Sequence, residues 1–216
     1  LKGSGLPDFR AIDSGQVREH IPILLQDLEA SLSELESDLE HVMATDQPLS
    51  WEVVMHPLQR ISERLRWSWG VVSHLNGVCN SADLREAHAS QQPEVVRLGN
   101  RLGQSQVLHR ALTRLQNTPA EPLSEARRRI LASELLSMNQ RGVGLEGEEQ
   151  LAFNRTSERL AELSTGFGNH VLDATQAWTL MLTEPSQVEG LPQQNRVEAV
   201  TLEAVPAGSH GNPVLV

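Results

Sequence analysis

The 216 residues carry 28 acidic and 18 basic side chains, a formal net charge of −10. This charge repels the phosphate backbone and anionic lipids, so we expect neither nucleic acid nor a membrane as a partner. No apolar run approaches the roughly 18 residues that a membrane-spanning helix needs. Apolar residues make up 39% of the chain and tyrosine is missing, so a core of leucine, valine and alanine favours helices over sheets. A single cysteine, Cys79, cannot form an internal disulfide, which favours a cytoplasmic location.

A long first helix is predicted from Val17 to Val42, where apolar residues recur every three or four positions. Asp13 or Ser14 can cap its start, because a short polar side chain accepts a hydrogen bond from a free backbone N–H of the first turn. The Asp46-Gln47-Pro48 segment ends it. The second helix should therefore return antiparallel to the first, since connections in helical bundles are short.

That second helix is predicted to start after Ser50 and to continue to Gly77 with the same period. Ser81 opens a third helical stretch, which Pro93 interrupts before the apolar pattern resumes as far as Leu115. We expect this stretch to bend rather than to run straight.

The fourth helix is predicted to begin at Ser124 and to end at the Gly142-Val143-Gly144 corner. A long fifth helix follows from Glu146 to Glu184-Pro185. Its apolar residues share one side and are Leu160, Leu163, Phe167, Val171, Ala174, Trp178 and Met181. The predicted fold class is all-α, a bundle of about five long antiparallel helices in residues 1–192. The tail, 193–216, is expected to be irregular, with a possible strand at Val197–Val205.

Eight histidines are scattered through the chain, and no two of them form an H-E-x-x-H run. In that run two histidines on one helix face bind zinc and the glutamate takes a proton from the metal-bound water. We therefore predict no catalytic residue, no cofactor-binding residue and no metal ligand in this chain.

Three further motifs have ordinary structural interpretations. His74 is expected to cap the second helix or link it to the core, and adjacent helical side chains diverge too far for Ser73 and His74 to form a nucleophile pair. The basic run Arg127-Arg128-Arg129 is expected to be a solvated surface. Cys79 is expected to be an inert or weakly exposed thiol.

Several segments, in this order, resemble the N-terminal helical region of the zinc oligopeptidases related to oligopeptidase A and thimet oligopeptidase. They are Gly5-Leu6-Pro7-Asp8-Phe9 with Ile12, Ser50-Trp51-Glu52 followed by Pro57-Leu58, Val72-Ser73-His74-Leu75-Asn76, Asn80-Ser81-Ala82-Asp83-Leu84-Arg85-Glu86-Ala87, Gly142-Val143-Gly144-Leu145, Arg159-Leu160-Ala161-Glu162-Leu163-Ser164, and Asn169 with Val171-Leu172-Asp173-Ala174-Thr175 before Trp178. The resemblance implies a zinc endopeptidase of short peptides, with two helical lobes around a deep channel. Its H-E-x-x-H region has no counterpart here, so residues 1–192 are expected to be an N-terminal lobe that is inactive without the catalytic lobe.

Two other interpretations remain open at this stage. The chain could be a stand-alone interaction module that binds a partner helix through the Val17–Val42 stripe. It could instead be a truncated, non-functional fragment, because residues 193–216 depart from the family's pattern.

Overall fold

The computed structural model describes residues 6–45, 47–179, 181–182, 186, 189–190 and 214–215. These residues form a short 3-10 turn, η1 (Phe9–Ala11), six α-helices, and two strands, β1 (Met181–Leu182) and β2 (Val214–Leu215). The predicted all-α class is thus confirmed, apart from the strand pair. The chain divides into two compact units, Leu1–Gly166 and Phe167–Val216.

The first two helices follow the predicted pattern closely. Helix α1 (Ser14–Ala44) begins after Asp13, whose carboxylate accepts a hydrogen bond of 2.8 Å from the Gln16 N–H. Helix α2 (Trp51–Val78) begins after Ser50, whose hydroxyl accepts one from the Val53 N–H at 3.3 Å. Polar caps therefore set both helix starts, as expected for short side chains in extended backbone.

The third stretch differs from its prediction, because it forms two helices. Helix α3 (Ala82–Gly103) runs through Pro93 without interruption, and α4 (Gln106–Asn117) begins after Ser105. The break falls where the Ser105 hydroxyl accepts a hydrogen bond of 3.1 Å from the Leu108 N–H and so starts a new helix. The cap at Ser105, and not Pro93, divides this segment. Because the segment forms two helices, the described residues contain six α-helices and not the expected five.

Helix α5 (Glu125–Gln140) and helix α6 (Gly147–Ala177) are joined by the predicted glycine corner. Gly142 has a φ of +80°, a left-handed conformation that glycine adopts without steric cost. Helix α6 ends earlier than predicted, so Met181 lies in β1, which pairs antiparallel with β2. The predicted helix end at 184–185 and the possible strand at 197–205 lie outside the described residues, as does the tail 193–216 except for Val214–Leu215.

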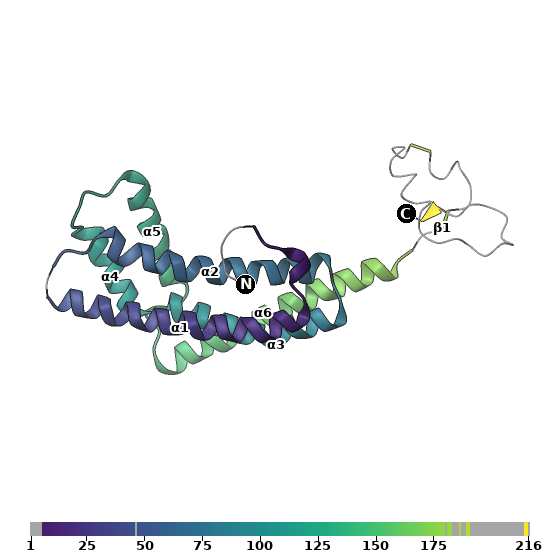
Figure 1. Cartoon of the computed structure of the whole chain (residues 1–216), viewed down its shortest axis with the longest axis horizontal. Coiled ribbons are helices and arrows are strands. Elements are labelled where there is room, and N and C mark those ends of the chain that lie inside the picture. Colours follow the sequence, from purple (N-terminus) through teal and green to yellow (C-terminus); the bar gives the residue numbers. More distant parts are fainter. Residues whose placement is uncertain are drawn as a thin grey trace. The chain divides into compact units, whose positions relative to one another are not determined.

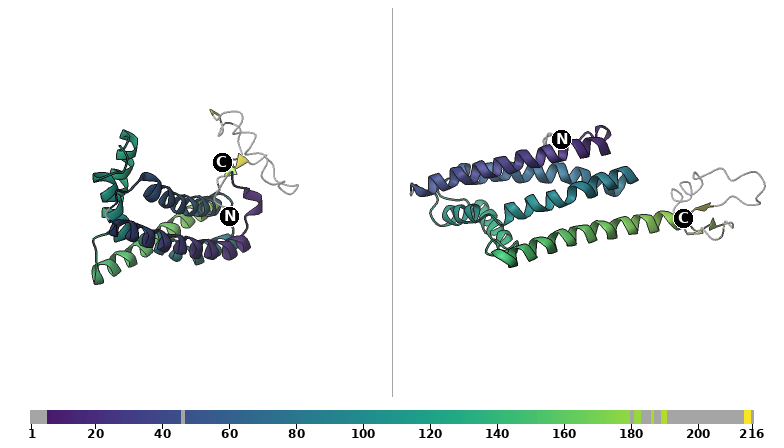
Figure 2. Two further views of the ribbon diagram at one scale, coloured as in Figure 1. Left: turned by 60° about the vertical axis from the view of Figure 1, so that its left-hand side comes forward. Right: turned by 90° about the horizontal axis from the view of Figure 1, so that it is seen from below.

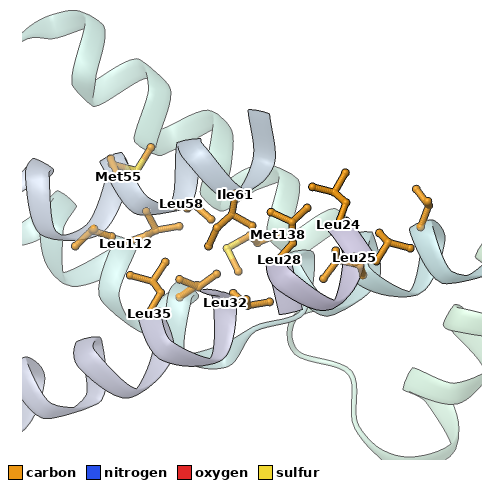
Figure 3. Close-up of a cluster of buried hydrophobic side chains, with 14 of the residues drawn as sticks. Leu24, Leu25, Leu28, Leu32, Leu35, Met55, Leu58, Ile61, Leu112 and Met138 are labelled. Carbon is orange, nitrogen blue, oxygen red and sulfur yellow. The ribbon is translucent and has the colours of Figure 1, made fainter. Parts of the chain in front are cut away.

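Helix α1 contributes the central part of the core. Helices α1, α2 and α3 lie side by side, and α4 and α5 lie at the end of the bundle where α1 connects to α2 (Figures 1 and 2). Leu28 and Leu32 of α1 are fully buried among side chains from the other helices (Figure 3). Burying each such leucine contributes about 1.5–3 kcal/mol. The Val17–Val42 stripe therefore faces the core, which contradicts its predicted use as a surface for a partner helix.

Candidate functional site

A groove of about 820 Å³ opens between α2 and α3, with residues of α4 and α5 also contributing to its lining. Its buried lining is apolar and includes Leu58, Val95 and Leu108. Its exposed lining carries charges of both signs, among them Glu63 and Arg66. A concave apolar surface with a few charged groups suits a ligand that presents both an apolar side chain and polar backbone or termini.

The buried histidine of this region is His88, on α3, and not the predicted His74. His88 is 4% exposed, its ring stacks on Trp69 of α2 at a centroid distance of 4.4 Å, and its Nε2 lies 3.3 Å from the Ser73 hydroxyl. His74 is exposed, with its ring 5.8 Å from the ring of Phe9. His88 is thus the residue that links a helix to the core, and the prediction for His74 was wrong on that point. The sequence did carry a signal, since His88 follows Leu84 by four residues on the apolar side of its helix.

Ser73 and His88 do not form an activated nucleophile. Burial lowers the pKa of His88, so its ring stays neutral at neutral pH. Its Nδ1 has no hydrogen-bond partner among the described residues. A catalytic serine needs a base that a third group orients and stabilises when charged, and this pair lacks that group in the part of the chain that the structure describes.

A polar junction connects α1, α5 and α6 to the point where α3 meets α4. Arg101 donates to both carboxylate oxygens of Glu36 on α1, one bond being 2.6 Å long, and the Ser105 hydroxyl donates to the same carboxylate. Burial alone would raise the pKa of Glu36, but the hydrogen bonds from Arg101 and Ser105, with the charge of Arg101, lower it below its ordinary value. Nearby, the Gln104 side chain donates to the Arg141 carbonyl at 3.0 Å and to Asn154 of α6 at 2.9 Å. Sequence reasoning missed this junction, because its members are far apart in the chain.

The basic run makes contacts within the bundle. The Arg127 guanidinium lies 4.9 Å from the ring centre of Trp51 and pairs with Glu52 at 3.4 Å, and Arg128 donates to the Leu123 carbonyl. Arg128 and Arg129 are exposed, which agrees with the predicted solvated surface. Cys79 is exposed as well and follows the last residue of α2, so it is more accessible than predicted.

The described residues contain no group of three or more His, Cys, Asp or Glu side chains that could hold a metal ion. The residues present in that part of the chain therefore do not fit a catalytic zinc ion. The eighth histidine, His210, lies outside it, so the absence of a metal site from the whole chain stays a prediction. No helix within the described ranges is long and apolar enough to cross a membrane.

Comparison with known proteins assigns this helical bundle to a family. Residues 21–150 match the family described as "Neurolysin/Thimet oligopeptidase, N-terminal domain". That match covers more than half of the chain, and the chain belongs to this family, as its sequence motifs predicted.

Individual relatives are oligopeptidases A. The chain is 35% identical over 193 residues to "Probable cytosolic oligopeptidase A" of Arabidopsis thaliana, which covers 89% of this chain and 26% of the relative. It is equally similar to "Organellar oligopeptidase A, chloroplastic/mitochondrial" of the same plant, and 32% identical to "Oligopeptidase A" of Haemophilus influenzae. The chain thus spans about a quarter of the length of the curated relatives that it matches.

Proposed function

We propose that this chain is the N-terminal helical part of a zinc-dependent oligopeptidase that cleaves short peptides, and that it does not hydrolyse peptides by itself. One observation carries the proposal: the match to oligopeptidases A covers 89% of this chain but only about a quarter of the relative. The H-E-x-x-H run that would hold zinc is missing from the sequence. Any catalytic zinc would then be held by the other part of such an enzyme.

The role that we propose for the helices is to line the substrate channel. The groove between α2 and α3 supports this role, because it combines apolar lining from Leu58 and Val95 with the exposed charges of Glu63 and Arg66. A short peptide offers apolar side chains and two charged ends, which such a surface can bind. The helices would select peptides by shape and charge, and the chemistry would occur elsewhere.

The location that we propose is the cytoplasm. The single cysteine and the printed name of the cytosolic Arabidopsis relative support it. The organellar relative, equally similar, identifies a chloroplast or mitochondrion as the alternative compartment.

A chimera tests the proposed function. The matched region of Haemophilus influenzae oligopeptidase A is replaced by this chain, and hydrolysis of a short fluorogenic peptide is measured with and without a chelator. We expect the chimera to cleave the peptide in a chelator-sensitive manner and the isolated chain to be inactive. A folded, metal-loaded chimera without activity would refute the proposal, and so would chelator-sensitive cleavage by the isolated chain. The unaltered Haemophilus enzyme is the positive control.

A further inference from the structure

Helix α6 contacts the bundle through its polar side. The Gln92 side chain of α3 donates to the Ala161 carbonyl at 3.2 Å and to the Thr165 hydroxyl at 2.8 Å. Farther along, Gln104 donates to Asn154. None of the α6 side chains that the structure describes is buried. This helix is therefore attached by hydrogen bonds and not by an apolar seam.

The apolar residues of α6 lie on a different side of the helix. Leu160 is 64% exposed and Leu163 is 52% exposed. Because each residue turns an α-helix by about 100°, these leucines point away from the side that carries Asn154 and Thr165. Phe167 and Val171, the apolar residues at the start of the second unit, are also exposed and continue the same spacing in the sequence. We call Leu160 and Leu163, which belong to the first unit, the α6 apolar face.

This arrangement is the reverse of an ordinary bundle helix, which buries its apolar side and exposes its polar side. Contiguous exposed apolar surface on a folded protein marks a site of contact with another polypeptide. The bundle core does not need this surface, because α1 fills it with Leu28, Leu32 and neighbouring side chains.

The relatives of this chain extend well outside the part that it matches. The match to the N-terminal domain family ends at residue 150, near the start of α6 at Gly147. Most of helix α6 therefore lies outside residues 21–150, and about three-quarters of the Arabidopsis relative lies outside the region that matches this chain. We propose that the α6 apolar face is the docking surface for the part of an oligopeptidase A chain that follows its N-terminal domain. This inference rests on the proposed function and names the partner surface within it.

Cysteine accessibility tests the docking surface directly. In a Cys79→Ser background, Leu163→Cys reports on the α6 apolar face, and Arg155→Cys is the matched control at an exposed polar position of the same helix. The rate of maleimide labelling is measured in the isolated chain and in the chimera with Haemophilus oligopeptidase A. We expect the chimera to slow labelling of Leu163→Cys at least about tenfold and to leave Arg155→Cys unchanged. Equal rates for Leu163→Cys in the two proteins would overturn the docking surface.

A second measurement does not depend on the folding of the chimera. This chain is mixed with the separately produced remainder of the Haemophilus enzyme, and complex formation is followed by analytical ultracentrifugation. We expect a complex that Leu163→Glu weakens at least about tenfold, while Arg155→Glu leaves its affinity unchanged. Absence of a complex, or a complex whose affinity Leu163→Glu does not change, would overturn the proposal. It would also be overturned by a dimer of the isolated chain that Leu163→Glu abolishes, because a second copy would then cover the face.

The two proposals can fail separately. An active chimera in which Leu163→Cys is labelled as fast as in the isolated chain would support the proposed function and refute the docking surface. A folded but inactive chimera in which Leu163→Cys is protected would do the opposite.

Discussion

His88 of α3 stacks on Trp69 of α2 with ring centroids 4.4 Å apart and ring planes inclined by 25°. The contact joins two helices on which the candidate groove also depends, since Trp69 is part of the groove lining. The stability of this contact depends on pH, because His88 is buried and burial lowers the pKa of its ring. Protonation would place a charge in an apolar environment next to the indole ring.

We predict that acidification destabilises the bundle through His88. In the unfolded chain this histidine has its ordinary pKa of about 6.5, so the unfolded state binds the proton first as the pH falls. Stability is therefore fully present above that value and decreases as the pH drops toward the lower pKa of the folded state. The measurement is the urea midpoint between neutral and mildly acidic pH. His88→Phe should keep the stacking and flatten this dependence, whereas an equal slope in His88→Phe and wild type would contradict the assignment.

The Glu36–Arg101 pair should stabilise the junction between α1 and α3 measurably. Glu36 is 14% exposed and makes two hydrogen bonds to Arg101, so Glu36→Gln should lower the free energy of unfolding by about 1–2 kcal/mol. The matched control is Glu40→Gln, which removes an exposed pair with Arg110 at 3.4 Å and should cost less than about 0.5 kcal/mol. Urea unfolding of both variants measures the difference, and equal losses would refute the junction's role.

The same pair predicts a second dependence on pH. The pKa of the Glu36 carboxyl is lowered in the folded state, so its contribution to stability is present above its ordinary pKa of about 4.3 and is lost as the pH falls through the folded value. Wild type should therefore lose its advantage over Glu36→Gln in acid. An advantage that stays constant into strong acid would show that the carboxylate charge is not responsible.

Substitutions at exposed positions of helix α1 should leave stability nearly unchanged, whereas substitutions at its buried positions should lower it. Leu32 is fully buried, so Leu32→Ala should destabilise the chain by about 2–5 kcal/mol through lost burial and a cavity. Ile23, on the same helix, is 60% exposed, and Ile23→Ala should change stability by less than about 0.5 kcal/mol. Thermal unfolding of the two variants checks this. Similar effects would mean that the α1 stripe does not form the core.

Filling the groove should alter peptide hydrolysis without harming the fold. A Cβ added at Gly99, in the groove lining, would meet no heavy atom within 4 Å, so a side chain at this position starts without a clash, and Gly99→Phe also removes a helix-weakening glycine. In the chimera we expect Gly99→Phe to raise KM for a short peptide several-fold, without loss of thermal stability. Gly70→Phe on α2, also open but outside the groove lining, is the control. An unchanged KM for Gly99→Phe would show that the groove does not bind the peptide substrate.

Local signals in the sequence identified the helix starts well. Asp13, Ser50, Ser81 and Ser124 each accept a hydrogen bond from the backbone N–H three residues later, a feature of four consecutive residues that no distant contact must supply. Ser105 caps α4 in the same way, but the prediction placed the interruption of this segment at Pro93. A proline removes only its own backbone donor, and α3 absorbs that loss.

Features that depend on distant segments could not be obtained from periodicity. The apolar stripes of α1 and α6 have the same spacing, yet Leu32 is buried and Leu160 is exposed. Periodicity identifies which residues share a side of a helix, whereas burial depends on what packs there. The same limit led to the choice of His74 over His88, since both lie on amphipathic helices and only the position of Trp69 distinguishes them.

We propose that this chain is part of a peptidase and does not itself hold the zinc ion needed for peptide cleavage. Equilibrium dialysis of the purified chain against zinc, followed by metal analysis and a fluorogenic peptide assay, tests it most directly. We predict that no equimolar zinc remains after dialysis and that no chelator-sensitive hydrolysis occurs. Retention of equimolar zinc together with such hydrolysis would show that the chain holds its own catalytic metal and would contradict the proposed function.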